Sequence, residues 1–79
     1  MLPMKAMVDP SSDHLGRGDA FERAGRYAEA AEAYRDAIVS DPQDVDARVR
    51  LGVVLRELGR DEEANETFRA ALELHAETV

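Results

Sequence analysis

The sequence predicts an all-α protein built from two antiparallel helix-turn-helix repeats, four helices in total. Three observations lead to this prediction. Thirteen of the 79 residues are alanine, the best helix former, and the charged residues, 34% of the chain, are mostly glutamate and arginine, which also favour helices. Glycine, proline and aspartate interrupt the chain at intervals that leave four segments of about 13 to 15 residues. The sequence also repeats itself with a period of 34 residues.

The first two helices are delimited by local signals. We expect one helix over 11–24, with a serine near its N-cap and Gly25 as the left-handed residue just past its end. The second should cover 28–40 and end before Pro42, which cannot continue a helix. The turn between them is short, so the two helices are expected to be antiparallel neighbours.

The third and fourth helices have the same kind of boundaries. The third is expected over 45–58, with Asp44 as its N-cap and Gly59 after its end. The fourth is expected over 62–76, with Asp61 as its N-cap. Together with the first pair, these two helices give two hairpins in sequence.

A shift of 34 residues superimposes the second hairpin on the first. The identical pairs are Gly18 and Gly52, Gly25 and Gly59, Arg26 and Arg60, Glu29 and Glu63, Ala30 and Ala64, Glu32 and Glu66, Arg35 and Arg69, and Ala37 and Ala71. The conservative pairs are Phe21 and Leu55, Tyr34 and Phe68, and Ile38 and Leu72. Because small and aromatic residues align together at one offset, the two hairpins are copies of one structural unit.

This pattern resembles the tetratricopeptide repeat, a 34-residue helix-turn-helix unit with a small residue in its first helix, then alanine, an aromatic residue and a final proline. The first copy matches at Gly18, Phe21, Ala30, Tyr34, Ala37 and Pro42, and the second at Leu51, Gly52, Ala64, Phe68 and Ala71. The chain departs from the pattern at His14 and Arg48, where the family has tryptophan, and at Ala76, where it has proline. The resemblance implies a short right-handed α-solenoid over 11–79, with repeats at 11–44 and 45–78, preceded by a flexible N-terminal segment, 1–10.

Two glycines lie in the middle of predicted helices, where each costs about 1 kcal/mol relative to alanine. We expect close helix packing to explain both. Gly18 should face Ala30, and Gly52 should face Ala64, so that the two helices of each hairpin touch backbone to backbone, with the aromatic residue one turn further on.

Helical periodicity separates two apolar faces on the third helix. The face predicted to be core comprises Ala47, Leu51, Val54, Leu55 and Leu58. The opposite face carries Val45, Val49 and Val53, flanked by charged residues. This second stripe is predicted either to bind a partner or to pack against the methionine-rich N-terminus.

In the tetratricopeptide family the first helix of each repeat lines a concave groove, and an apolar strip with charged edges suits a peptide or helix. The resemblance places Ser12 and Arg23 of the first repeat and Glu57 of the second on this surface. Partner contacts are expected at Leu15, Asp19, Glu22, Asp46, Val49, Arg50, Val53 and Arg56. Only Arg50 could hold a C-terminal carboxylate, so binding of a chaperone-type tail is not expected.

Composition excludes several other functions. The formal net charge of −7 repels phosphate backbones and anionic membrane surfaces, so neither nucleic acid nor a membrane is expected as a partner. There is no cysteine, and His14 and His75 have no neighbour at metal-ligand spacing. No nucleophile and base are placed to act together. We therefore expect a cytoplasmic, non-catalytic protein without metal or cofactor, whose partner is another protein or a peptide; a regulatory subunit of an enzyme would look the same in sequence.

Charged residues recur at helical spacing, as in Glu22 with Arg26 and Glu32 with Arg35, and are expected to pair on solvated helix faces.

The two ends of the array differ from its middle. The first helix has Asp13 and Arg17 where the third has Ala47 and Leu51. The fourth helix has polar residues, Asp61, Glu62, Asn65, Thr67 and Glu73, where the second has Tyr27, Ala28, Ala31, Ala33 and Val39. These replacements predict a complete two-repeat protein or the end of an array. Leu72 and Leu74 remain on the fourth helix, however. They could form a homodimer interface with Met4 and Met7, since solenoids generally need about three repeats for stability.

Overall fold

The computed structural model describes residues 10–78, so the predicted flexible segment lies outside the described residues except for Pro10. The described chain consists of four α-helices and contains no strand. The helices are α1 (Pro10–Arg23), α2 (Tyr27–Ser40), α3 (Val45–Glu57) and α4 (Asp61–Thr78). Every helix boundary lies within two residues of its prediction, and the all-α fold class is confirmed.

Both hairpin turns end the preceding helix in the same way. Gly25 has φ = 78° and Gly59 has φ = 80°, the left-handed region that favours glycine. The amide of Gly25 donates to the carbonyl of Glu22 at 3.0 Å, and the amide of Arg26 donates to the carbonyl of Phe21 at 2.8 Å. The second turn repeats both bonds one period later. Each repeat therefore has a Schellman cap, which satisfies carbonyls that a helix end otherwise leaves open.

The two aspartates expected to cap helices have different roles. The Asp44 side chain accepts a hydrogen bond from the amide of Ala47 at 3.2 Å, so the predicted N-cap of α3 is confirmed. The prediction for Asp61 was wrong, because α4 already begins at this residue and the carbonyl of Arg60 accepts from the amide of Ala64. Asp61 instead lies in the first turn with Glu62 and Glu63, where carboxylates interact favourably with the helix dipole.

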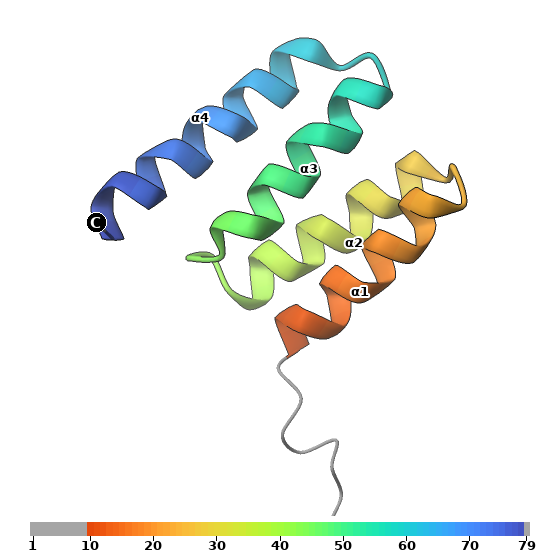
Figure 1. Ribbon diagram of the computed structural model, residues 1–79, viewed down its shortest axis with the longest axis horizontal. Coiled ribbons are helices and arrows are strands. Elements are labelled where there is room, and N and C mark those ends of the chain that lie inside the picture. Colours follow the sequence, from red (N-terminus) through yellow and green to blue (C-terminus); the bar gives the residue numbers. More distant parts are fainter. Residues whose placement is uncertain (1–9, 79) are drawn as a thin grey trace, which may run out of the picture.

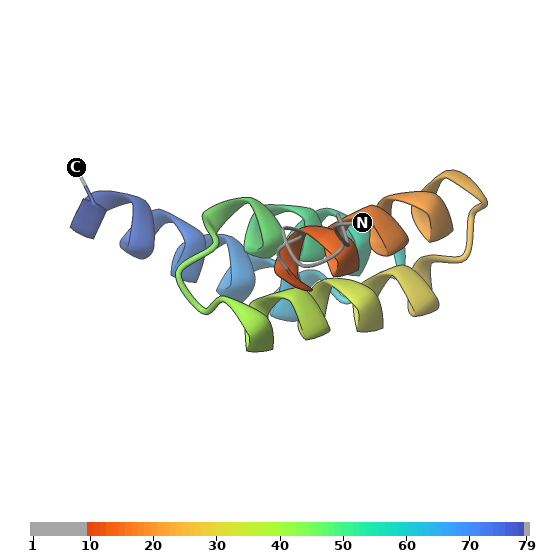
Figure 2. The ribbon, with the colours of Figure 1, turned by 90° about the horizontal axis from the view of Figure 1, so that it is seen from below.

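Successive helices pack against each other in chain order (Figure 1). Figure 2 shows α1 and α3 in one layer with α2 beneath them. Helix α2 therefore contacts its own hairpin partner, α1, on one side and the first helix of the next repeat, α3, on the other. This arrangement leaves α1 and α3 to form one continuous face of the molecule.

The core contains mostly alanine. The buried apolar residues are Ala30, Ala31, Ala33, Tyr34, Ala37, Ala47, Leu51, Val54, Leu55, Ala64 and Ala71. Tyr34, Leu55 and Val54 are the largest side chains that are fully buried. The predicted core face of α3 is confirmed: four of its residues are buried, and Leu58 packs against the core cluster.

The mid-helix glycines have a different neighbour from the one we expected. A Cβ atom on Gly18 would collide with the ring of Tyr34, and one on Gly52 would lie 2.6 Å from Cε1 of Phe68. The prediction of close packing is therefore correct, but its partner was wrong, since the aromatic ring itself occupies the space beside each glycine. In each repeat the glycine of the first helix leaves space for the aromatic side chain of the second helix.

Candidate functional site

The eight residues predicted to contact a partner all come from the two helices of one face. Leu15, Asp19 and Glu22 lie on α1, and Asp46, Val49, Arg50, Val53 and Arg56 lie on α3. None of the eight is fully buried. We refer to these eight residues as the α1/α3 surface.

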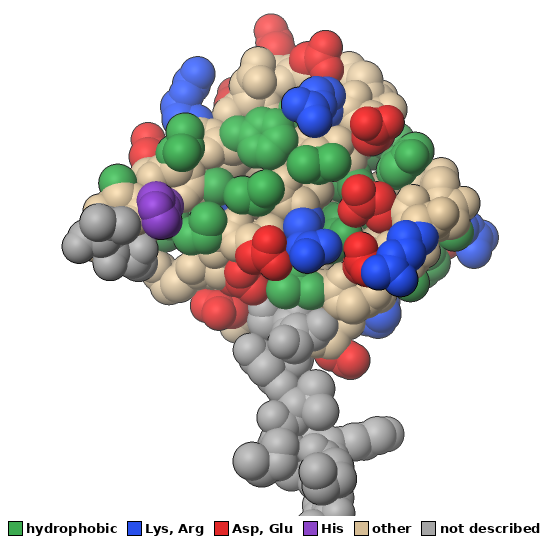
Figure 3. All heavy atoms as spheres, viewed as in Figure 1, with side chains coloured by type: hydrophobic (Ala, Val, Ile, Leu, Met, Phe, Trp, Pro, Cys, Tyr) green, Lys and Arg blue, Asp and Glu red, His purple; other side chains and the backbone are tan. Residues whose placement is uncertain are grey.

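The apolar part of the α1/α3 surface runs along α3. Val49 is 39% exposed, Val53 is half-buried beside it, and Leu15 of α1 packs partly against the core. Figure 3 shows green hydrophobic side chains gathered over α3 and α4, and charged side chains of both signs over the seam between α3 and α1. The alternative cover for the valines, Met4 and Met7, lies outside the described residues.

Arg50 is the centre of the charged part. Its Nε lies 3.1 Å from Oδ2 of Asp46 on the same helix, and its Nη1 lies 3.6 Å from Oδ1 of Asp19 on α1. Arg23 contacts the other oxygen of Asp19 at 2.8 Å. The hydrogen bond to Asp46 raises the pKa of Arg50 above its ordinary value. Arg50 therefore joins the first helices of the two repeats, and a carboxylate from a partner would have to compete with both aspartates.

Tyr34 of α2 lies beneath the α1/α3 surface and contacts one of its residues, Glu22. Its ring is fully buried, and its hydroxyl donates a hydrogen bond to Oε1 of Glu22 at 2.8 Å. Burial, reinforced by the hydrogen bond to the Glu22 carboxylate, raises the pKa of Tyr34 to about 12, although nearby Arg50 acts in the opposite direction. Glu22 is thus partly engaged within the protein and is held in place beside α2.

The second repeat replaces both members of this pair. Phe68 stands at the position of Tyr34, and Arg56 stands at the position of Glu22. Phe68 has no hydroxyl to donate a hydrogen bond, and the Arg56 guanidinium carbon instead lies 6.0 Å from the centre of the Phe68 ring, a cation–π distance. The difference between the repeats could have been found in the sequence, because both substitutions appear when the two repeats are aligned at the 34-residue offset.

The ion pairs differ from those expected from helical spacing. Glu22 accepts from Tyr34 rather than pairing with Arg26, which contacts Glu29 at 2.8 Å. Arg35 does not pair with its helical neighbour Glu32 but with Glu63 of α4, at 2.8 Å. Both predicted pairs were therefore wrong. The Arg35–Glu63 contact links the second helices of the two repeats, as the Asp19–Arg50 contact links the first helices.

Raising the pH from 10 to 12 should destabilise the wild type through Tyr34. The unfolded tyrosine loses its proton near pH 10 and the folded one near pH 12, so this contribution is complete below pH 10 and is lost as the pH rises through that window. The loss should reach about 2 kcal/mol at pH 12. Urea denaturation followed by circular dichroism measures it.

Tyr34→Phe is the matched control, because the second repeat already carries phenylalanine at this position. The variant should lose about 1 kcal/mol at neutral pH, where only the hydrogen bond is missing. Its stability should then fall less steeply than that of the wild type above pH 10. Parallel pH profiles for the two proteins would contradict a buried, hydrogen-bonded hydroxyl.

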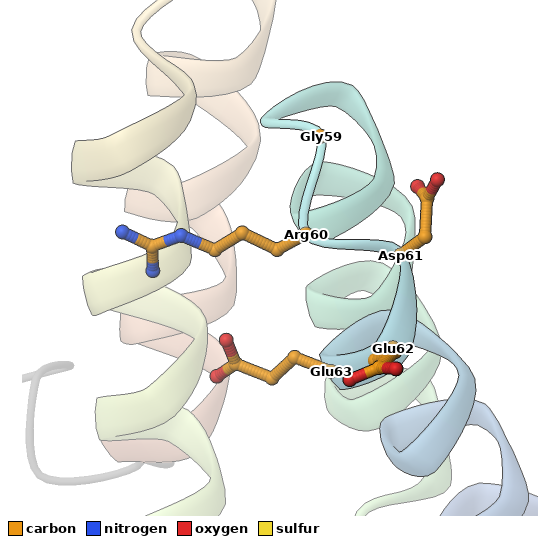
Figure 4. Close-up of a pocket in the computed structure, with 5 residues that line it drawn as sticks. All are labelled: Gly59, Arg60, Asp61, Glu62 and Glu63. Atoms are coloured by element: carbon orange, nitrogen blue, oxygen red, sulfur yellow. The ribbon is translucent and has the colours of Figure 1, made fainter.

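A pocket of about 420 Å³ lies away from the α1/α3 surface, beside the turn between α3 and α4. It is lined by Gly59, Arg60, Asp61, Glu62 and Glu63 (Figure 4). Figure 4 shows Arg60 and Glu63 reaching toward α2, where Glu63 meets Arg35. Within the described part of the chain, no three His, Asp or Glu side chains are grouped as a metal site would require, and no helix has the length and apolar character needed to cross a membrane.

The comparison with known families agrees with the repeat seen in the fold. Residues 15–77, most of the chain, match the family described as tetratricopeptide repeat. The chain belongs to this family, whose members generally act as protein–protein interaction modules.

Its relatives are much longer proteins. The whole chain is 30% identical, over an alignment of 82 residues, to tetratricopeptide repeat protein 16 of Mus musculus, and covers 11% of that protein. Ninety per cent of the chain is 32% identical over 74 residues to tetratricopeptide repeat protein 16 of Homo sapiens, covering 8% of it. A shorter match of 49 residues, 62% of this chain, is 41% identical to 5% of the motility hub protein FimV of Pseudomonas aeruginosa. The chain therefore spans only about a tenth, or less, of these curated relatives.

Proposed function

We propose that this chain is a non-catalytic adaptor that binds a segment of another protein on the α1/α3 surface. The observation that carries the proposal is the apolar strip on α3, formed by the exposed Val49 and the half-buried Val53 and bordered by charged side chains. The opposite face of this helix supplies the buried residues Ala47, Leu51, Val54 and Leu55, so the exposed Val49 lies outside the core. Apolar strips of this kind accept helices and peptides.

The charges beside the strip indicate the chemistry of the partner. Asp19 and Asp46 already neutralise Arg50, and Glu22 accepts from Tyr34. A partner gains little by presenting a carboxylate to an arginine that has two carboxylates of its own. We infer that the bound segment is anchored by apolar side chains against α3, and that polar contacts at the rim set its orientation.

Val49→Glu is expected to weaken partner binding by about tenfold, which corresponds to about 1.4 kcal/mol. The substitution places a charge in the centre of the apolar strip. Since Val49 is exposed, helicity and the melting temperature should stay close to those of the wild type, within about 0.5 kcal/mol of stability. Val53→Glu should also weaken binding. The measurement is a quantitative pull-down from the lysate of the source organism, followed by titration of the proteins recovered.

Val39→Glu is the matched control for this experiment. Val39 is 80% exposed on α2, outside the α1/α3 surface, and its replacement changes the net charge by the same amount. Val39→Glu should bind the partner as tightly as the wild type, whereas Val49→Glu should bind it about tenfold more weakly. If Val49→Glu unfolds the protein, the valine belongs to the core, and if both variants keep the partner, binding occurs elsewhere.

A further inference from the structure

The second repeat leaves uncovered the surface that the first repeat buries. On α2, Ala31 and Tyr34 are buried in the cluster that includes residues of α3, the next helix in the array. Among the described residues no following helix covers the equivalent strip on α4, although its Phe68 ring packs beside Gly52 of α3. Its Leu72 is 69% exposed, Asn65 is exposed, and Phe68 is half-buried. We define Asn65, Phe68, Arg69 and Leu72 as the tail face.

The opposite end of the molecule carries the matching surface. Helix α1 is the repeat equivalent of α3. Its outward residues Asp13, Arg17 and Ala20 are exposed, and so is Ala24 in the turn directly after it. On α3 the equivalent positions are Ala47, Leu51 and Val54, which are buried, and the partly buried Leu58. We define Asp13, Arg17, Ala20 and Ala24, with Glu29 of α2 beside them in the same repeat, as the head face.

We propose that the head face of a second copy of this chain docks on the tail face, so that copies stack head to tail in the way the second repeat stacks on the first. The internal contact supplies the geometry. Within one chain, α3 covers Tyr34 of α2, and Glu63 of α4 reaches back to Arg35 at 2.8 Å. In the stack, α1 of the second copy takes the place of α3, and its α2 takes the place of α4.

Charge complementarity identifies the second copy as the occupant. The internal pair of Arg35 and Glu63 has the repeat equivalents Arg69, on the tail face, and Glu29, on the head face of the same chain. Arg69 is exposed on the tail face, and Glu29 is exposed next to Arg26, which it contacts at 2.8 Å. Head-to-tail stacking brings Glu29 of one copy to Arg69 of the other and recreates the internal ion pair between chains.

The second ion pair between the repeats, Asp19 with Arg50, has no charged equivalent at the junction between copies. The repeat equivalents of Asp19 and Arg50 are Val53 and Gly16. Gly16 is exposed and has no atom within 4 Å of where a Cβ would be, while Val53 is half-buried. Stacking places the open glycine of one copy beside this valine of the other.

The polar residues of the two faces also correspond. Ala31 and Leu51 belong to one buried cluster inside the chain. Their equivalents, Asn65 on the tail face and Arg17 on the head face, are both polar, so the stack sets a polar residue against a polar residue. A symmetric tail-to-tail dimer would instead bring together Arg69 and Arg56 from both copies, because Arg56 lies over the ring of Phe68. Like charges then oppose that arrangement.

A head-to-tail contact that continues the stacking of a solenoid does not close into a ring, so it should give assemblies that lengthen with concentration. Sedimentation velocity and light scattering on the 79-residue chain, from low to high micromolar concentration, should show a weight-average mass that rises above the monomer and passes the dimer. Arg69→Glu and Glu29→Arg should each raise the concentration needed for assembly about tenfold, since each places like charges at every junction. Circular dichroism of both variants at low concentration should match that of the wild type, because both residues are exposed.

Mixing the two variants is the decisive step. In an equimolar mixture the two variants can alternate along the stack. At one junction the two substituted side chains meet, and they have opposite charges. At the next junction wild-type Arg69 meets wild-type Glu29. Assembly should therefore return to the wild-type concentration range. Leu72→Glu should also weaken assembly, and mixing it with either charge variant should not restore assembly to the wild-type concentration range. A wild type that stays monomeric to high micromolar concentration would overturn the proposal. A dimer that Arg69→Glu weakens and Glu29→Arg leaves unchanged, or a mixture that stays monomeric, would overturn it as well.

Discussion

Leu55→Ala is expected to lower the free energy of unfolding by about 2 to 5 kcal/mol. Leu55 is fully buried in the cluster that joins α2, α3 and α4, and its removal leaves a cavity between the two repeats. Domains of this size seldom gain more than about 3 to 5 kcal/mol from one core. The variant should therefore lose a large part of its total stability, as measured by far-UV circular dichroism and urea titration.

Leu72→Ala provides the matched control, because it removes the same atoms from an exposed position on α4. At a concentration where the protein is monomeric, it should change stability by no more than about 0.5 kcal/mol. Equal losses for the two variants would show that Leu55 does not lie in the principal core.

Enlarging either repeat-equivalent alanine should also destabilise the protein, by about 1 to 3 kcal/mol for Ala30→Leu and for Ala64→Leu. Both alanines are buried in the core cluster, and a close-packed core has no room for three more carbon atoms unless neighbouring side chains move. The two losses should be similar, because the two positions have the same role. Thermal and urea denaturation by circular dichroism measure them.

Ala28→Leu controls for the effect of leucine in a helix. Ala28 is exposed on α2, two residues before Ala30, so the same substitution should leave stability within about 0.5 kcal/mol of the wild type. If Ala30→Leu behaves like Ala28→Leu, the hairpin has space that close packing does not allow.

The sequence predicts the fold well because the signals for its helices are local. Gly25 and Gly59 supply the left-handed residue that each turn requires, and Asp44 supplies a hydrogen-bond acceptor for the start of α3. Asp61 shows the limit of such signals, since several acidic residues in a row are favourable both at the N-cap and in the first turn. Periodicity also predicts which face of α3 is buried, because that question depends on one helix alone.

The contacts that organise the α1/α3 surface could not be predicted in the same way. A helical wheel shows which direction Tyr34 faces, but not that its ring lies against Gly18 or that its hydroxyl reaches Glu22. The Arg35–Glu63 pair spans 28 residues and depends on the angle at which the repeats stack. These contacts follow from the packing between helices, and only comparison of the two repeats gives an indication of them. The eight residues of the surface remain a prediction that the binding experiment tests.

Packing in chain order also has a consequence for how the protein folds. Each helix makes its main contacts with the helix before or after it, so most contacts join neighbouring segments of the sequence. Proteins with this topology fold in microseconds to milliseconds, and either hairpin can form before the other. The chain has no tryptophan, and Tyr34 of the first hairpin is buried where the second hairpin packs against it. In a Tyr27→Phe variant, the fluorescence of Tyr34 therefore reports packing around this ring, by Gly18 of its own hairpin and by α3 of the second, whereas circular dichroism follows the formation of the helices themselves.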